Sequence, residues 1–352
     1  MTGRSSKKAL HICIAAAGGG YLLLSAIFVY YTLLLPPDSP SVALAAEQPQ
    51  EQFATITVWE EDDFSQVAAE LKEKGLIRSQ LLFEWYARST GRDLVRPGTY
   101  RIPRGLDADM LLTLLGRGAR KKVTVRIPRG ATIFEIDTLL ASRHIIRPGS
   151  LVALQKNGKI EGKLFPDTYS FFTESSARTV AIRMIHNFAA HTEKIFGNLS
   201  RAARERTLTI ASILEREVHG FEEMRTVAGI IERRLAHRMP LQMDATICYI
   251  KHQQAFFAGK EIASCAPILL VDLKLKSPYN TYLNRGLPPG PIGNPGISAI
   301  RAALSPKSSP YWYYLSDPIT GRTVFSKTFD EHKSNKRKFL QGRGVSLYRG
   351  EH

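Results

Sequence analysis

The stretch from Thr55 to Leu76, TITVWEEDDFSQVAAELKEKGL, changes its hydrophobic period along its length. Apolar and polar residues alternate up to Val58, which is typical of a half-buried strand. From Phe64 onward, apolar residues return every three to five positions, which predicts an amphipathic helix. Strand and helix therefore follow one another directly, and we expect an α+β fold.

Two further elements extend this first unit. A second helix is expected near 81–88, and Pro97–Ile102 has the pattern of a turn that enters a strand. The order strand, helix, helix, strand resembles LysM-like modules, so 53–120 is predicted to form a LysM-like βααβ module.

A weak repeat follows this module, because Val123–Val125 echoes Ile56–Val58 and similar helical spacing comes after it. Residues 121–160 are therefore either a second LysM-like βα unit or another amphipathic segment that resembles the first by chance. Both interpretations stay open on the sequence alone.

The N-terminal segment has no charged residue from Ala9 to Pro37. Its length predicts one transmembrane helix over 9–35, with a Pro- and Ala-rich linker over 36–52. A cleaved signal peptide is the alternative, because Ala43–Ala45 resembles a cleavage site.

Basic residues at positions 4, 7 and 8 precede the predicted helix, whereas acidic residues follow it. The positive-inside rule then places the N-terminus, 1–8, in the cytoplasm. We therefore expect a single-pass protein of the cytoplasmic (inner) membrane whose C-terminal part is periplasmic or otherwise extracytoplasmic.

The whole chain of 352 residues is basic, with 48 Lys and Arg against 32 Asp and Glu and a formal net charge of +16. Such a charge favours anionic neighbours such as nucleic acid, acidic lipid headgroups or an acidic polymer like the cell wall. No zinc-type cysteine pair and no aromatic pattern of an RNA-binding module accompanies the basic residues, so we expect no nucleic-acid partner.

The three cysteines are Cys13, Cys248 and Cys265, and Cys13 lies inside the apolar run. Cys248 and Cys265 would pair only in an oxidising compartment, and the expectation is two independent buried thiols.

The histidines are scattered, and neither a His-Glu-x-x-His motif nor a phosphate-binding loop is present. We therefore predict no metal site and no cofactor.

Glu217 stands near the end of a predicted helix that begins about Arg201. Apolar residues precede it by seven, four and three positions, so its carboxyl should rise from an apolar stripe. Partial burial disfavours the carboxylate and suits a general acid. Glu215 has smaller and more polar helical neighbours and is expected to stay ionised, although on spacing alone both glutamates fit ordinary exposed positions equally well.

Several motifs then appear in a fixed order. They are Glu161–Tyr169 (EGKLFPDTY), Ala211–Glu217 (ASILERE), Leu241–Thr246 (LQMDAT), Ser277–Tyr282 (SPYNTY), Gly286–Ile292 (GLPPGPI) and Asn294–Gly296 (NPG). Together they resemble the endolytic murein transglycosylase family, MltG/YceG-like. The resemblance covers essentially everything after residue 53, together with the anchor.

The resemblance implies a YceG-like catalytic domain of mixed α+β structure over 121–352, preceded by the LysM-like module. It also implies that Glu217, the second Glu of a Glu-basic-Glu motif, is catalytic. The expected activity is a lytic transglycosylase that cuts the bond between N-acetylmuramic acid and N-acetylglucosamine and leaves 1,6-anhydro ends. Such an enzyme would trim or terminate nascent glycan strands, with peptidoglycan, the cytoplasmic membrane and cell-wall synthases as partners.

The remaining motif residues are predicted to line the sugar cleft. Gln242, Asp244 and Asn280 would hydrogen-bond sugar hydroxyl or acetamido groups, and Tyr279 and Tyr282 would offer flat faces to pyranose rings. Thr281 and Glu215 complete the predicted substrate-binding set, and Asp244 could also orient Glu217. The alternative is structural: Asn280 and Asp244 as turn or capping residues and the tyrosines as core.

Three positions depart from the family pattern: Ala245 replaces a usual proline, Val218 a usual threonine, and Thr323 a common histidine. His332 matches the pattern, and a structural role is favoured for it.

Two other functions remain open. One is a non-catalytic peptidoglycan-binding scaffold, and the other is a hydrolytic muramidase in which Asp244 or Glu215 activates water.

Overall fold

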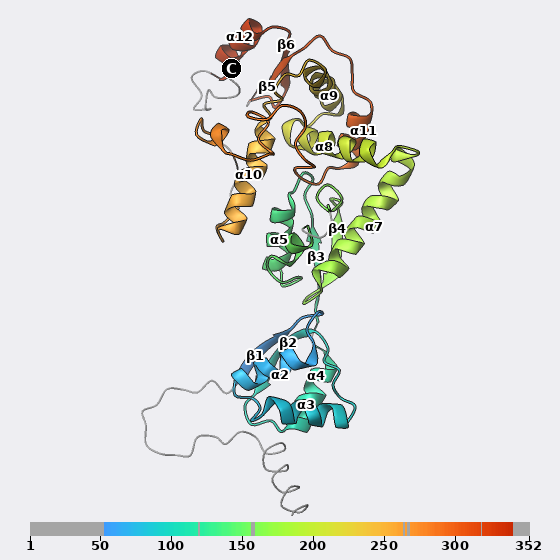
Figure 1. Cartoon of the computed structure of the whole chain (residues 1–352), viewed down its shortest axis with the longest axis vertical. Helices are drawn as coiled ribbons and strands as arrows, with labels where there is room; N and C mark the ends of the chain where they lie inside the picture. The colour runs from blue at the N-terminus through green and yellow to red at the C-terminus, as the bar shows by residue number, and fades with distance from the viewer. Residues whose placement is uncertain are drawn as a thin grey trace, which may run out of the picture. The chain divides into compact units, whose positions relative to one another are not determined.

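A computed structural model of the chain describes residues 53–118, 120–155, 159–262, 265, 268–317 and 319–340 (Figure 1). The predicted transmembrane helix, the linker and Cys13 lie outside these residues. None of the helices in the described part of the chain is long and apolar enough to cross a membrane. The chain divides into two compact units, of which the first holds the described residues up to Lys122 together with Phe172–Ser176.

The first unit combines a two-stranded antiparallel sheet with three helices. Its elements are β1 (Phe53–Val58), α2 (Phe64–Glu73), α3 (Gln80–Ser89), β2 (Gly98–Pro103) and α4 (Ala108–Arg117). In the sheet Phe53 lies opposite Pro103 and Val58 opposite Gly98. Alternate strand residues and one face of each helix form its core. The predicted order of the first four elements is confirmed, whereas α4 was not foreseen.

Local capping explains where the helices begin. The side chains of Asp63 and Thr132 each accept a hydrogen bond from the backbone N–H three residues later. In return, the side chains of Gln66 and Glu135 accept the backbone N–H of Asp63 and of Thr132. These capping boxes satisfy two backbone donors at each helix start. Single side-chain caps at Ser79, Asp107 and Ser200 start α3, α4 and α8 in the same way.

The second unit contains the remaining residues and most of the predicted motifs. Its elements are β3 (Lys122–Arg126), α5 (Ile133–Ser142), α6 (Ser150–Leu154), β4 (Thr168–Phe172), α7 (Ala177–Phe196), α8 (Arg201–Glu217), α9 (Phe221–Ala236), α10 (Asp244–Phe257), the 3-10 turn η1 (Asp272–Lys274), α11 (Ile297–Leu304), β5 (Tyr313–Ser316), β6 (Thr323–Ser326) and α12 (Phe329–Leu340). Strand β3 pairs with β4, and β5 with β6 as an antiparallel hairpin. The predicted α+β class is confirmed.

Helix α8 is the central element of this unit. Every residue from Thr207 to Leu214 is buried, as expected of a helix covered on all sides. Helices α9, α10 and α11 all pack against it, and Figure 1 shows α9 and α11 beside it. Both ends of α8 leave the core, and its last turn carries the two glutamates of the ASILERE motif.

Several motif residues join distant segments inside the core. The Asn294 side chain donates to the Glu161 carboxyl at 2.8 Å and accepts the Leu164 N–H at 2.8 Å. The Ile292 N–H donates to the Ser212 hydroxyl at 3.0 Å, which ties the Pro-rich loop to α8. These motif positions therefore fix the scaffold around the end of α8.

Cys248 and Cys265 form a disulfide with their Cα atoms 5.3 Å apart. The expectation of two independent thiols was therefore wrong. The chain reverses after α10 at Gly259, whose φ of +63° favours glycine, and this turn brings Cys265 back beside the helix. Sequence spacing could not give that distance.

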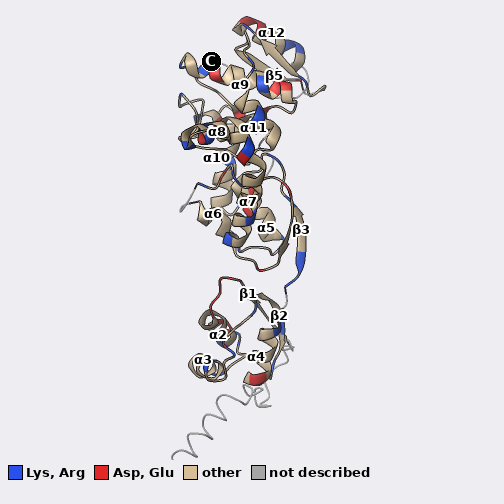
Figure 2. Cartoon of the chain, turned by 90° about the vertical axis from the view of Figure 1, so that its right-hand side faces the viewer, with Lys and Arg blue, Asp and Glu red and all other residues tan. Residues whose placement is uncertain are grey.

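Charged residues of both signs are distributed over the elements of both units (Figure 2). Some form surface ion pairs, such as Lys163 with Glu205 and Arg206 with Glu232. Pairs of this kind contribute little to stability. The positive net charge is thus spread over the surface rather than concentrated at one element.

Candidate active site

Glu217 is the last residue of α8 and is half-buried. Its Oε1 accepts the backbone N–H of Ala245 at 3.1 Å. Ala245 lies in the first turn of α10, a helix whose N-cap residue, Met243, makes no side-chain capping bond. The Glu217 carboxylate thus satisfies a free N–H at the positive end of the α10 dipole, which stabilises the negative charge.

The second carboxyl oxygen of Glu217 is held by Tyr314 on strand β5. The Tyr314 hydroxyl lies 3.0 Å from Oε2 and also 3.0 Å from the Met243 sulfur. A hydroxyl has one proton to donate, and a carboxylate accepts it better than a thioether does. Both oxygens of Glu217 are therefore oriented by hydrogen bonds from other elements.

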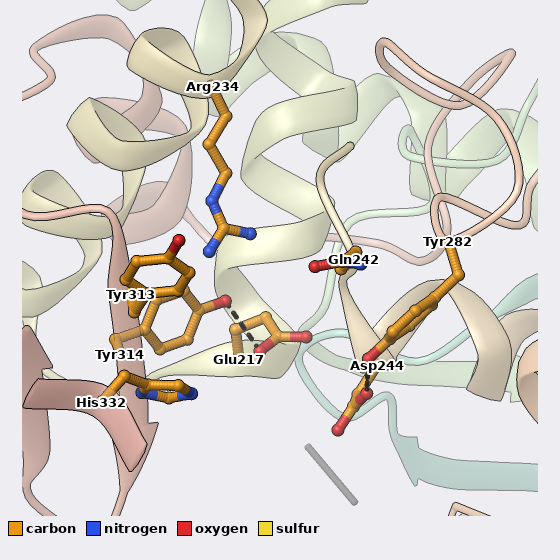
Figure 3. Close-up of a pocket in the computed structure, with 8 residues that line it drawn as sticks. All are labelled: Glu217, Arg234, Gln242, Asp244, Tyr282, Tyr313, Tyr314 and His332. Atoms are coloured by element: carbon orange, nitrogen blue, oxygen red, sulfur yellow. Dashed lines mark hydrogen bonds between the residues drawn. The ribbon is translucent and has the colours of Figure 1, made fainter. Parts of the chain in front are cut away.

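Arg234 on α9 brings a buried positive charge toward this carboxyl. Its guanidinium donates to the Leu241 carbonyl at 2.6 Å and to the Trp312 carbonyl at 3.0 and 2.6 Å. Burial lowers the pKa of Arg234, whereas the pocket tyrosines and, to a smaller extent, Glu217 act to raise it. In Figure 3 the guanidinium points from α9 toward the Tyr314 hydroxyl and Glu217. This guanidinium thus places a positive charge beside the carboxyl group of Glu217.

Three of the predicted binding residues reach the same pocket. Gln242 has a positive φ of 50°, a conformation that is strained for a residue with a side chain. The Tyr282 hydroxyl donates to Asp244 Oδ1 at 2.5 Å. Figure 3 shows Gln242, Asp244 and Tyr282 on one side of Glu217, facing Tyr313, Tyr314 and His332 on the other.

The pocket itself has a volume of about 50 Å³ and is lined by the eight residues of Figure 3: Glu217, Arg234, Gln242, Asp244, Tyr282, Tyr313, Tyr314 and His332. Such a volume holds a few water-sized groups. Its walls carry two carboxyl groups, a guanidinium and three phenols.

Other predicted binding residues do not line this pocket. The Asn280 side chain is fully buried and donates to the carbonyls of Leu273 and Leu275. Thr281 is also buried, and its hydroxyl accepts the N–H of Met243 at 2.9 Å. Tyr279 packs on Tyr249 with ring centroids 4.8 Å apart. Thr281 therefore supports the segment that carries Gln242 and Asp244, whereas the other two residues hold the η1 turn and pack on α10.

Glu215 faces a different hollow from Glu217. Its Oε2 accepts the N–H of Gly296 at 2.8 Å. Burial raises the pKa of Glu215, against the opposing effects of that bond and of Arg129 and His219 nearby. The helical neighbours had suggested a carboxyl that stays readily ionised. The difference arises because distant residues bury it.

Three pocket residues, Arg234, Tyr313 and Tyr314, were missed from the sequence. The pair Tyr313–Tyr314 lies on an aromatic strand, which is a common core pattern, and Arg234 is one of three arginines on its helix. His332 had been favoured as structural, and it is buried, stacks on Tyr313 with centroids 5.3 Å apart and also lines the pocket. Within the described ranges, no group of three or more His, Cys, Asp or Glu residues could hold a metal ion.

A family model and several curated proteins are similar to this chain, and they point to the same family. The model of the YceG-like family matches residues 56–338. A Bacillus subtilis protein named endolytic murein transglycosylase is 28% identical over 332 residues, covering 86% of this chain and 89% of the relative. A Streptococcus pneumoniae protein of the same name is 24% identical over 323 residues, and the chain covers 58% of its length.

A solved structure shares the fold. The crystal structure of a YceG-like protein from Listeria monocytogenes is 26% identical and superposes with a TM-score of 0.51. The match covers 81% of this chain and all of the Listeria chain.

Proposed function

We propose that this chain, which belongs to the YceG-like family, is a peptidoglycan lytic transglycosylase whose acid/base is Glu217. The relatives named endolytic murein transglycosylase support the substrate and the reaction class. The observation that carries the assignment is the carboxyl of Glu217, held through both oxygens at a pocket with polar and aromatic walls.

In the first step, the protonated Glu217 gives its proton to the oxygen that links muramic acid C1 to the next sugar. The bond from C1 to that oxygen breaks, and N-acetylglucosamine leaves with a free hydroxyl. The positive charge that develops on the muramic ring then faces the new carboxylate. That carboxylate is stabilised by the Ala245 N–H, the Tyr314 hydroxyl and the nearby Arg234 charge.

In the second step, the Glu217 carboxylate removes the proton of the muramic C6 hydroxyl. The C6 oxygen attacks C1 and closes a 1,6-anhydro ring, and the proton returns Glu217 to its starting state. No water is consumed, so one carboxyl group suffices for the whole reaction.

Gln242, Asp244 and Tyr282 are proposed to hold the sugar at this carboxyl. Gln242 is strained in the conformation that presents it, and strain of this kind gathers at functional positions. The bond from Tyr282 fixes one oxygen of Asp244.

Hydrolysis is the second candidate, because Asp244 places another carboxyl group in the same pocket. In a hydrolytic muramidase Asp244 would activate water. Glu215 is not suited to that role, since it lines a different hollow. A scaffold that only binds glycan is the third possibility.

The masses of the products separate these three functions. Purified glycan strands are digested with the full chain in detergent. The proposal expects fragments with anhydro ends, which are lighter by one water molecule than the reducing ends that hydrolysis leaves. Reducing ends would replace the proposal with a muramidase, and intact strands would support the scaffold.

The location and the cellular role are also proposals. We propose that 9–35 anchors the chain in the cytoplasmic membrane, and that the LysM-like module and the catalytic unit act outside it on nascent strands near membrane synthases. The disulfide between Cys248 and Cys265 supports an oxidising, extracytoplasmic location.

A further inference from the structure

The last turn of α8 is held to the rest of the unit by each of its three final side chains. Glu217 accepts the N–H of Ala245, at the start of α10. Glu215 accepts the N–H of Gly296, the N-cap residue of α11, at 2.8 Å. Arg216, between the two glutamates, donates to two groups at and before the start of α5. The turn that carries the proposed acid/base is therefore fixed by three separate segments.

Arg216 binds its segment through both a carbonyl and a carboxylate. Its guanidinium donates to the Gly130 carbonyl at 2.9 Å and to the Glu135 carboxylate at 3.2 Å. Gly130 has a φ of +73°, and a Cβ there would lie 3.2 Å from the Arg216 side chain. The Arg216 side chain is therefore closely packed against this segment as well as hydrogen-bonded to it.

Glu135 supplies the negative charge of this contact. It is the third residue of α5 and is half-buried, and its Oε2 also accepts the Thr132 N–H at 2.7 Å. Burial acts to raise the pKa of Glu135, but His252, Arg216 and the Thr132 N–H lower it to about 2. Glu135 is therefore an anion at neutral pH.

The same carboxylate oxygen also faces α10, a helix that packs against both α5 and α8. His252 is 3% exposed, and its Nδ1 lies 3.5 Å from the Glu135 Oε2. At this distance a ring N–H, neutral or charged, attracts the carboxylate. Ala245 and His252 are seven positions apart, which is about two helical turns, so they lie on one face of α10. Glu135 thus contacts the face of α10 that reaches Glu217.

We infer, resting on the proposed function, that Glu135 is a positioning residue for Glu217. Its carboxylate binds Arg216, the residue before Glu217 on α8. It also contacts His252, on the α10 face that carries Ala245. Both ends of the bond from the Ala245 N–H to the Glu217 carboxyl are thus held to one anion. Glu135 does not line the pocket at Glu217, so it acts through the geometry of this bond.

The reaction depends on that geometry for two reasons. A hydrogen bond weakens steeply as its angle departs from a straight line. A displacement of about 1 Å at a catalytic group lowers the rate by about 10²-fold. Glu135→Gln keeps the shape of the side chain but removes its charge, and bonds to a neutral group are about half as strong. The variant should therefore hold α8 and α10 together less firmly at Glu217.

The first measurement reads this geometry without turnover. Hydrogen exchange of the Ala245 amide is followed by NMR in the full chain in detergent. In Glu135→Gln this amide should exchange about tenfold faster than in wild type. Glu232→Gln is the matched control, because Glu232 pairs with Arg206 of the same helix at the surface, and it should exchange like wild type.

Amides of α2 in the first unit are the internal reference and should be unchanged. An unchanged rate at Ala245 in Glu135→Gln would overturn the positioning role. Faster exchange at α2 as well would also overturn it, because the variant would then have lost stability as a whole.

The second measurement is steady-state kinetics on glycan strands. Positioning predicts a kcat about tenfold lower for Glu135→Gln, with KM within about twofold of wild type, because the substrate contacts remain. Arg216→Lys keeps a cation beside Glu135 and should lose less activity than Arg216→Ala. A wild-type kcat in Glu135→Gln, or equal losses in the two Arg216 variants, would contradict the inference.

Failure of the proposed function would have a different signature. The wild type would then release reducing ends or leave the strands intact. The exchange rate of the Ala245 amide would still report on Glu135, since it requires no substrate.

Discussion

The carboxyl of Glu217 depends on residues that are distant in the sequence. Its two oxygens accept hydrogen bonds from Ala245 and from Tyr314, which lie 28 and 97 positions later. These bonds orient the carboxyl and share its negative charge after the proton has left. A change at Tyr314 should therefore act on the chemical step more than on binding.

Tyr314→Phe removes the bond to Oε2 but keeps the aromatic ring. A hydrogen bond to a charged group contributes about 1.5–3 kcal/mol, so kcat should fall about tenfold or more with little change in KM. Steady-state kinetics on glycan strands measure both constants. Tyr311→Phe, on a ring that stacks on Phe325 outside the pocket, is the control and should keep its kcat. Equal losses in the two variants would refute the role of Tyr314.

Glu161 is a second carboxyl with an unusual environment. It is 2% exposed, and burial raises its pKa to about 8, although the Ile133 N–H and the Asn294 amide act to lower it. The folded state therefore holds a proton that the unfolded chain releases above about 4.5. Stability should fall as pH rises from about 4.5 to 8, because over that range the folded state binds more protons.

Glu161→Gln mimics the protonated side chain and should weaken this dependence. Melting temperatures of the full chain at pH 5.5, 7 and 8.5 measure it. The wild type should lose stability toward pH 8.5 by on the order of a few kcal/mol more than the variant. Glu205→Gln, which alters a surface ion pair, should follow the wild type. Parallel pH profiles for wild type and Glu161→Gln would contradict the raised pKa.

At the scale of elements, the segment after α11 carries the chain along α9 toward β5 and Tyr314. The Lys307 N–H donates to the Arg225 carbonyl at 2.9 Å, and the Arg233 side chain donates to the Ser309 carbonyl at 3.0 Å. Gly229 lies between these contacts, and a Cβ there would be 2.0 Å from the Lys307 carbonyl oxygen. The close approach requires glycine.

Gly229→Ala should force the two segments apart and destabilise the protein by about 2–3 kcal/mol. Gly116→Ala is the control, because a Cβ at this α4 position meets nothing within 4 Å. That change should be neutral or stabilise the helix by up to about 1 kcal/mol. Chemical denaturation measures both, and a Gly229→Ala protein as stable as wild type would rule out the tight packing.

Hydrophobic periodicity predicted β1, α2, α3, β2 and the helix that carries Glu217, because each of these patterns is local. It could not distinguish motif residues that face the pocket from those that support it. Asn280 and Thr281 share a motif with Tyr282, yet their side chains bond to backbone groups and do not line the pocket. Such a difference depends on contacts between segments rather than on spacing within one.

At the scale of the whole molecule, the sequence could not show which segments of the chain pack in which of the two units. Phe172–Ser176 belongs to the first unit although its first residue ends β4 of the second, and the Thr173 N–H donates to the Lys121 carbonyl at 2.8 Å. The pairing of Cys248 with Cys265 was missed for the same reason. The membrane anchor, the LysM-like character of the first unit and the extracytoplasmic location remain predictions.

The central claim is that one carboxyl, Glu217, moves the proton in both steps. The most direct measurement is the rate at which anhydro-ended fragments form from purified glycan strands, with wild type, Glu217→Gln and Glu205→Gln side by side. General acid–base catalysis predicts a fall of about 10²–10⁴-fold for Glu217→Gln. Glu205→Gln, on the same helix but in a surface ion pair, should stay within about twofold of wild type. Anhydro ends released by Glu217→Gln at the wild-type rate would contradict the account.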